Sequence, residues 1–387
     1  MTSDKAARAA TLDELDTPCL LLDEPRMQAN IDRLKTRMAR LGVTLRPHLK
    51  TPKSIDVARR LMASPEGPAA VSTLQEAEQF ARAGVRDILY AVGVSPAKLE
   101  RVLALRAQGT DLTVVVDSVA GAQAVAARSR AAGVPIPALI EIDCDGHRAG
   151  VRPGQTELLG AIGRVLDESG TQLRGVLTHA GESYSSTDED AIRAMAERER
   201  RAAVDAAQAL RASGLPCPVV SVGSTPTAMF AENLDGVTEV RAGVFVFFDL
   251  FMAGLGVCRQ DDIALSVLTT VIGHQLEKDW ILVDAGWMAM SRDRGTAGQA
   301  VDQYYGVVCD AQGRPLGDLV LKQTNQEQGI VMRRPGTSGP LPPLPLGTRL
   351  RILPNHACAT GAQHDAYQVV RGASPEVVAC WPRFRGW

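Results

Sequence analysis

The sequence lacks an excess of charge of either sign and lacks long uncharged apolar runs. Its 42 lysines and arginines against 44 aspartates and glutamates give a formal net charge of −2, and no basic run is interleaved with aromatic residues. Nucleic acid is therefore not expected as a partner. No uncharged apolar run reaches the roughly 18 residues of a membrane-spanning helix, so no membrane partner is expected either.

Cysteine is sparse and shows no paired spacing. The seven cysteines lie at positions 19, 144, 217, 258, 309, 358 and 380, and none forms a Cys-x-x-Cys motif. An odd number of scattered cysteines is typical of a reducing compartment rather than of a disulfide framework. Residues 1–16 also lack the apolar core of a signal peptide. The expected location is therefore the cytoplasm.

Short apolar runs alternate with amphipathic segments over much of the 387 residues. Nearly continuous apolar runs are typical of parallel strands buried on both faces. The expected strands are residues 43–47, 69–73, 87–91, 112–116, 138–143, 173–178, 218–222 and 237–241. Apolar residues at helical spacing predict helices over 25–41, 74–83, 118–132, 154–169 and 187–213. Eight strands with helical crossovers predict an α/β fold, a (β/α)8 barrel.

An open doubly wound sheet is the alternative to the barrel. It would usually carry a glycine-rich phosphate turn after its first strand, whereas residues 46–53 contain no glycine. The barrel is therefore favoured.

After Gly254 the runs are strand-like and lack convincing helices, as at 264–268, 280–283 and 349–353. They predict a second, mostly β domain, which the strand-like run at 19–22 can join. The predicted domains are a barrel over residues 23–253 and a β-rich domain formed by residues 1–22 and 254–387.

Lys50 lies between two prolines, Pro47 and Pro52, that disfavour helix in the residues before them. We therefore place it just past the end of the first barrel strand, before a helix that starts near Ser54. Most lysines are simply exposed at the surface. Lysine also forms Schiff bases with carbonyls, and partial burial lowers its pKa towards that use.

Polar residues gather at the predicted carboxyl ends of the barrel strands, which is where such barrels carry their catalytic groups. His48 and Lys50 follow the first strand, and three of the six histidines lie at such ends. The other ends carry residues 143–150, 178–184, 223–227 and 241–244.

Residues 223–227, Gly-Ser-Thr-Pro-Thr, would offer backbone N–H groups and hydroxyls at a helix start. The alternative is an ordinary N-capped turn. A phosphate cradle after strands seven and eight, together with a lysine on the first strand, would suit pyridoxal 5′-phosphate (PLP).

The pair His356 and Cys358 is a candidate metal site in the second domain. In extended backbone both side chains would point to one face, and imidazole with thiolate suits Zn²⁺ or a related ion. Two ligands would leave coordination positions open for water or substrate. The alternative is a structural cysteine beside a hydrogen-bonded histidine. The nearby pair His364 and Asp365 is interpreted as structural.

Taken together, these motifs resemble the fold-type III PLP enzymes that act on D-3-hydroxy amino acids, a family of dehydratases and aldolases. The resemblance covers nearly the whole chain. It rests on residues 46–51, 145–151, 178–181, 220–227, 284–294 and 353–363. Aldolases of the family tend to carry His-x-Asp where this chain has His356-x-Cys358, which favours a dehydratase. The substrate this suggests is D-threo-3-hydroxyaspartate, which would yield oxaloacetate and ammonia.

The resemblance also implies roles for single residues. Lys50 would bind PLP as a Schiff base and remove the α-proton as general base. Arg148 would face the pyridine nitrogen, with His179 by the ring and Tyr184 hydrogen-bonded to the cofactor. The phosphate would be bound around Gly223, Ser224, Thr225, Gly243 and Val244. His356 and Cys358 would hold a divalent ion (Zn, Mn, Co or Mg) that polarises the β-hydroxyl, and the assembly would be a homodimer.

Several alternatives stay open at this point. A D-threonine-type aldolase would release glycine and an aldehyde, and a D-serine dehydratase would differ only in substrate. A racemase would need a second acid or base, for which Tyr304 and Tyr305 are the candidates. A PLP carrier would usually be the barrel alone, and a barrel without PLP would lack the aldimine absorption band. Arg292 and Arg294 are candidates for binding a second substrate carboxylate.

Overall fold

The computed structural model describes residues 10–168 and 170–387. The chain divides into two compact units, each described here by itself. The barrel unit comprises Asp32–Gly243 and Phe384–Trp387, and the sheet unit comprises the described residues up to Ile31 and Val244–Arg383. The domain boundaries predicted at residues 23 and 253 stay predictions. Residues 1–9 of the predicted β-rich domain and residue 169 of a predicted helix lie outside the described part of the chain.

Eight parallel strands form the sheet of the barrel unit, in the order β3-β10-β9-β8-β7-β6-β5-β4. The ring is nearly closed, because a bridge joins His48 to Ala70 beyond the end of β3 and the Leu49 N–H donates to the Ala70 carbonyl at 2.8 Å. The barrel prediction is confirmed, with all eight predicted strands in place. Their bounds are β3 Thr44–Pro47, β4 Ala69–Val71, β5 Asp87–Gly93, β6 Asp111–Val116, β7 Pro137–Ile142, β8 Gln172–Thr178, β9 Val219–Val222 and β10 Glu239–Ala242.

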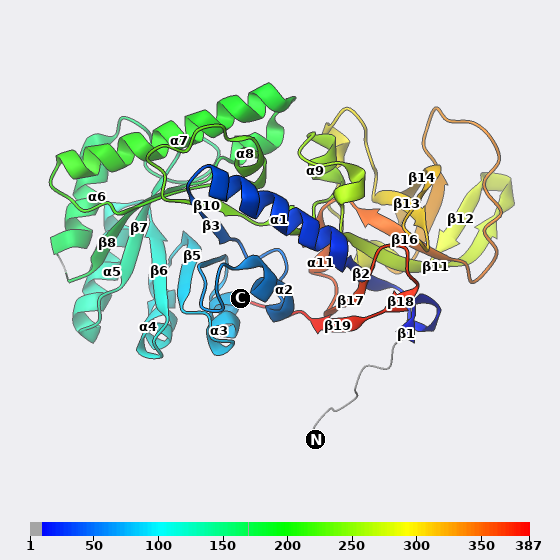
Figure 1. Cartoon of the computed structure of the whole chain (residues 1–387), viewed down its shortest axis with the longest axis horizontal. Coiled ribbons are helices and arrows are strands. Elements are labelled where there is room, and N and C mark those ends of the chain that lie inside the picture. Colours follow the sequence, from blue (N-terminus) through cyan, green and yellow to red (C-terminus); the bar gives the residue numbers. More distant parts are fainter. Residues whose placement is uncertain (1–9, 169) are drawn as a thin grey trace, which may run out of the picture. The chain divides into compact units, whose positions relative to one another are not determined.

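Helices separate most of these strands, and Figure 1 shows α6 and α7 alongside β7 and β8. Several begin at capping side chains: Thr73, Ser118 and Asp188 each accept a backbone N–H from three residues further on. The helices are α1 Glu24–Arg40, α2 Ile55–Leu61, α3 Leu74–Arg82, α4 Leu99–Ala107, α5 Val119–Ala132, α6 Thr156–Glu168, α7 Glu189–Ala212 and α8 Thr225–Phe230.

The sheet unit is built on a nine-stranded sheet in the order β12-β15-β14-β13-β16-β11-β2-β17-β19, with β12 also paired to β11. The prediction that the first strand joins this domain is confirmed, since β2 lies between β11 and β17. The strands are β2 Cys19–Asp23, β11 Leu265–Gln275, β12 Trp280–Val283, β13 Gly306–Asp310, β14 Pro315–Thr324, β15 Gly329–Arg333, β16 Arg349–Pro354, β17 Ala366–Val370 and β19 Ala379–Pro382.

Smaller elements complete the sheet unit. Strands β1 (Ala10–Thr11) and β18 (Glu376–Val377) form a separate two-stranded ladder. Three short helices, α9 (Leu250–Gly254), α10 (Trp287–Met290) and α11 (Ala357–Gly361), interrupt the strand connections. Within the two described ranges, none of the helices combines the length and the apolar character that crossing a bilayer requires.

Candidate cofactor and metal sites

Lys50 lies three residues beyond the end of β3, in the turn that precedes α2, as predicted. Its side chain is exposed, so the expectation of partial burial is wrong. The reason is local, because the last residue of this segment that pairs with β4 is Leu49, and Lys50 follows it into the open turn. The Lys50 charge still acts on two histidines at the carboxyl ends of the barrel strands, which form the rim of the barrel. These are His48 and His179, and the charge favours their neutral forms.

His48 carries a buried ring nitrogen, Nδ1, that has no hydrogen-bond partner in the described residues. Its other ring nitrogen, Nε2, lies 3.4 Å from the Ser72 hydroxyl. Burial, followed by the charges of Lys50 and Arg241, holds the pKa of His48 well below its ordinary value. The ring is therefore neutral and presents an unused polar atom beside the lysine turn.

His179 follows β8, and its Nδ1 donates to the Gly223 carbonyl at 2.8 Å. Burial lowers the pKa of His179 to about 3, with the charges of Arg148 and Lys50 acting in the same direction. A carbonyl oxygen can only accept, so Nδ1 carries the proton and Nε2 is left unprotonated. Tyr184 lies nearby, with its ring centroid 6.1 Å from that of His179 at an interplanar angle of 44°.

Arg148 belongs to the loop after β7 and its side chain is exposed. Its positive charge acts on two residues of the barrel unit, His179 and Glu141 of β7. Burial raises the pKa of Glu141, and the Arg148 guanidinium opposes that shift. Arg148 and Lys50 thus both act electrostatically on His179, at the carboxyl ends of the strands.

The loop after β9 is a capped helix start in which most donors are already used. The Ser224 hydroxyl accepts the Thr227 N–H at 3.2 Å, and the Ser224 N–H donates to the Thr227 hydroxyl at 3.1 Å. Ser183 donates its own proton to the Ala180 carbonyl, so the 2.8 Å contact between Ser183 and Ser224 is donated by Ser224. By contrast, the buried hydroxyl of Thr225 has no partner in the described residues. Thr225 is therefore the side chain with a free donor.

Two glycines allow the barrel strands to approach closely here. Gly223 has φ +141°, and a Cβ on it would overlap the backbone of Arg241. A Cβ on Gly243, after β10, would lie 2.9 Å from the Thr51 hydroxyl and 3.1 Å from the His48 carbonyl oxygen. Val244, the next residue, begins a 3-10 turn of the sheet unit, Val244–Val246.

Glu199 was not predicted from the sequence, although it lies at the centre of these loops. Its carboxylate accepts the N–H groups of Ala180 and Gly223, at 3.0 and 2.9 Å, and the Thr227 hydroxyl at 2.7 Å. The signal that could have found it is a glutamate within the buried stripe of α7, between Ala196 and Ala203.

In the sheet unit, His356 is the N-cap of α11 and Cys358 lies inside that helix. The expectation that both lie in extended backbone is therefore wrong, because β16 ends at Pro354 and the chain turns into a helix. The two side chains are nevertheless brought together, since the His356 ring is hydrogen-bonded to the Cys358 thiol. In the described part of the chain no group of three or more His, Cys, Asp or Glu residues could hold a metal ion.

Two carboxylates that the sequence did not single out support this pair. The His356 Nδ1 lies 2.6 Å from Asp293 Oδ2, and buried Asp249 accepts the Ala357 N–H at 2.9 Å. Burial opposes the charged form of His356, yet the bonds to Asp293 and Cys358 raise its pKa to about 11. Nearby His364 donates to the Ala289 carbonyl at 2.9 Å, which agrees with its structural interpretation.

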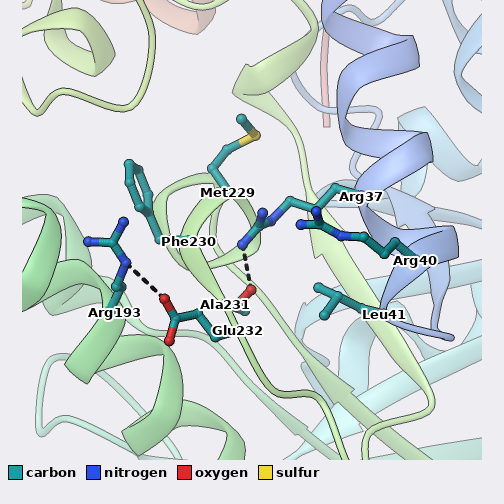
Figure 2. Close-up of a pocket in the computed structure, with 8 residues that line it drawn as sticks. All are labelled: Arg37, Arg40, Leu41, Arg193, Met229, Phe230, Ala231 and Glu232. Atoms are coloured by element: carbon teal, nitrogen blue, oxygen red, sulfur yellow. Dashed lines mark hydrogen bonds and ion pairs between the residues drawn. The ribbon is translucent and has the colours of Figure 1, made fainter.

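A cavity of about 400 Å³ lies elsewhere on the barrel unit, away from the predicted site residues. Figure 2 shows two of its arginines bonded within the chain: Arg193 pairs with Glu232 at 3.2 Å, and Arg37 donates to the Ala231 carbonyl at 2.5 Å. None of the predicted cofactor residues lines this cavity. A second cavity, of about 790 Å³, lies between α7 and residues 143–146 of the loop that carries Arg148.

Comparison with models of known protein families places both parts of the chain in known classes. Residues 22–250 match the family model of the alanine racemase N-terminal domain, and residues 264–370 match that of a putative serine dehydratase domain. The chain belongs to the alanine racemase N-terminal domain family.

Particular relatives are similar over nearly the whole chain. D-threo-3-hydroxyaspartate dehydratase of Delftia sp. (strain HT23) is 58% identical over 97% of this chain and 99% of the relative. D-threonine aldolase of Arthrobacter sp. is 29% identical over 93% and 90%.

The solved structures include a metal-free form of a D-threo-3-hydroxyaspartate dehydratase in which a cysteine is replaced by alanine. It has a TM-score of 0.94 and 57% sequence identity, covering 98% of this chain and all of the other. The resemblance to enzymes of D-3-hydroxy amino acids is thereby confirmed.

Proposed function

We propose that this protein is a PLP- and divalent-metal-dependent dehydratase that converts D-threo-3-hydroxyaspartate to oxaloacetate and ammonia. The observation that carries the proposal is the 58% identity to a dehydratase of that substrate over almost the full length of both chains. The D-threonine aldolase, at 29%, is a more distant relative. A homodimer located in the cytoplasm is part of the same proposal.

The barrel unit offers residues that fit PLP. The buried, unpartnered hydroxyl of Thr225 and the absence of side chains at Gly223 and Gly243 suit a phosphate group held close to the backbone. Lys50 would bind the aldehyde, Arg148 would face the pyridine nitrogen, and His179 and Tyr184 would flank the ring. When bound, PLP supplies an electron sink next to the substrate α-carbon.

The remaining chemistry would come from the chain itself. The Lys50 amine would take the α-proton of the substrate as general base. Arg148 cannot give up its proton, so it would hold a facing pyridine nitrogen unprotonated. His179 would remain a neutral ring at physiological pH, because its pKa of about 3 keeps Nε2 free of a proton.

The sheet unit offers residues that fit a metal ion. A histidine whose Nδ1 is held by a carboxylate, as His356 is by Asp293, has the arrangement commonly seen for a metal-ligating histidine. That leaves Nε2 of His356, together with the Cys358 sulfur, as the proposed ligands. A divalent ion held there would act as a Lewis acid on the β-hydroxyl leaving group. Two protein ligands leave coordination positions for that hydroxyl.

The proposed activity is tested by its dependence on both cofactors. We expect ammonia release from D-threo-3-hydroxyaspartate when PLP and Mn²⁺ or Zn²⁺ are supplied, and less from D-serine and D-threonine. A chelator should abolish release, and adding the ion back should restore it. Release that is indifferent to both PLP and chelator would contradict the proposal.

The phosphate assignment makes a separate prediction at Thr225. Thr225→Val should weaken PLP binding by roughly 10- to 100-fold, because a hydrogen bond to a charged group contributes about 1.5–3 kcal/mol. The measurement is a titration of the PLP-free protein followed by absorbance. Thr225→Ser keeps the hydroxyl and should bind PLP almost normally. Equal affinities for the Val variant and the unchanged protein would remove Thr225 from the site.

A further inference from the structure

Glu199 is a buried carboxylate on the inward face of α7. Its side chain is 2% exposed and lies in a stripe whose other buried members include Ile192, Ala196 and Ala203. Burying a carboxylate among such residues is costly unless hydrogen bonds compensate it. Burial raises the pKa of Glu199, and the hydrogen bonds from Thr227, Gly223 and Ala180, followed by the charge of Arg241, oppose that shift.

The three hydrogen-bond donors come from the loop after β8, the loop after β9 and the first turn of α8. Ala180 directly follows His179, and its N–H donates to Glu199 Oε1 at 3.0 Å. Gly223 directly precedes Ser224, and its N–H donates to the same oxygen at 2.9 Å. The Thr227 hydroxyl, in the first turn of α8, donates to Oε2 at 2.7 Å. One carboxylate therefore ties the loop after β8 to the loop after β9.

The three hydrogen bonds to Glu199 also determine which groups donate and which accept in the neighbouring hydrogen bonds. Since the Thr227 hydroxyl donates to Glu199, it is an acceptor for the Ser224 N–H. The Ser224 hydroxyl, in turn, donates to Ser183 and accepts the Thr227 N–H. Each of these groups is used inside the rim, which leaves the buried Thr225 hydroxyl as the unpartnered one.

A second contact, made by the His179 ring, joins the same two loops. His179 Nδ1 donates to the carbonyl of Gly223, the residue whose N–H is bound by Glu199. The Gly223 backbone is thus held at both its N–H and its C=O, and the residue cannot shift without breaking one of the two bonds. The position of Thr225, two residues further on, follows from this clamp.

We propose that Glu199 is a positioning residue whose carboxylate sets the loop after β9 against the loop after β8, so that Thr225 presents its hydroxyl to the phosphate of PLP. The inference rests on the proposed function, because it assumes that PLP is the ligand. Glu199 touches neither the cofactor nor the substrate in this scheme. Its effect is exerted on phosphate recognition and is transmitted through Gly223 and Thr227.

The test compares a ligand that has the phosphate with one that lacks it. PLP and pyridoxal share the aldehyde and ring, and only PLP has the group that Thr225 would bind. The full-length protein, freed of PLP, is titrated with each ligand by absorbance for Glu199→Ala, Glu199→Gln and the unchanged sequence. The control is Glu189→Gln, an exposed glutamate at the start of the same helix.

Glu199→Ala leaves two buried N–H groups unpaired, and we expect at least about a 30-fold loss of PLP affinity from it. Glu199→Gln can still accept both N–H groups on its carbonyl oxygen but not the Thr227 proton, and we expect about a 5-fold loss. Pyridoxal affinity should change less than about twofold in both, and Glu189→Gln should bind both ligands normally.

Equal losses for PLP and pyridoxal, or no loss of either, would overturn the positioning role. If the Ala variant fails to fold, the Gln variant decides between the two outcomes, with its melting temperature showing that it is folded. A purely structural brace would lower the melting temperature and leave the ratio of the two affinities unchanged. If the unchanged protein does not bind PLP, the proposed function fails instead.

Discussion

Lys50→Ala should remove the visible absorption of bound PLP and lower turnover by at least about 10³-fold, since it deletes both the Schiff-base amine and the proposed general base. Both readouts come from one protein sample, by an absorbance scan and an ammonia assay. Because Lys50 is exposed, its replacement by alanine should leave folding intact.

Two arginine variants separate the amine from the charge. Lys50→Arg keeps the charge and cannot form a stable Schiff base, so it should behave as the alanine variant does. Lys53→Arg makes the same chemical change in the same turn and keeps a cation for Glu76, 3.1 Å away. It should retain the absorption band. A Lys50→Ala protein that still eliminates ammonia at the original rate would reject the assignment.

Cys358→Ala should lower bound metal and elimination together, the latter by at least about 10²-fold, because a Lewis-acid role contributes several kcal/mol. Metal content is measured by elemental analysis, and ammonia release is measured on the same sample. His356→Ala should act in the same way. Asp293→Asn should weaken the metal affinity by about 10- to 100-fold, since it only orients the histidine.

The matched control is Cys380→Ala, which removes an exposed cysteine from the same unit. Metal content and turnover should both stay at the level of the unchanged protein. If the Cys358 variant loses metal and keeps full elimination, the ion has no part in the reaction.

The barrel was predictable because parallel strands buried on both faces leave nearly continuous apolar runs, such as residues 112–116. The sheet unit was predicted only in part. Strand β14 contains Pro315, Gly317 and Asp318, and its pairing with β13 is shifted by an irregularity, so its pattern is weak. Strand β2, by contrast, was clear from its apolar run.

The candidate site shows where such patterns stop being informative. The chain at His356 turns into a helix whose first N–H, that of Ala357, is accepted by Asp249, more than a hundred residues away. The partners of Glu199 likewise come from loops outside its helix. Motifs pointed to the residues proposed to carry the chemistry, whereas the carboxylates proposed to position them depend on contacts between segments distant in sequence.

The most direct test of the central claim is the identity of the products formed from D-threo-3-hydroxyaspartate by the protein loaded with PLP and a divalent ion. Loss of the β-hydroxyl, followed by hydrolysis of the resulting imine, predicts oxaloacetate and ammonia in equal amounts, with no glycine. Glycine and an aldehyde in their place would show that the Cα–Cβ bond is broken, and the dehydratase assignment would then be wrong.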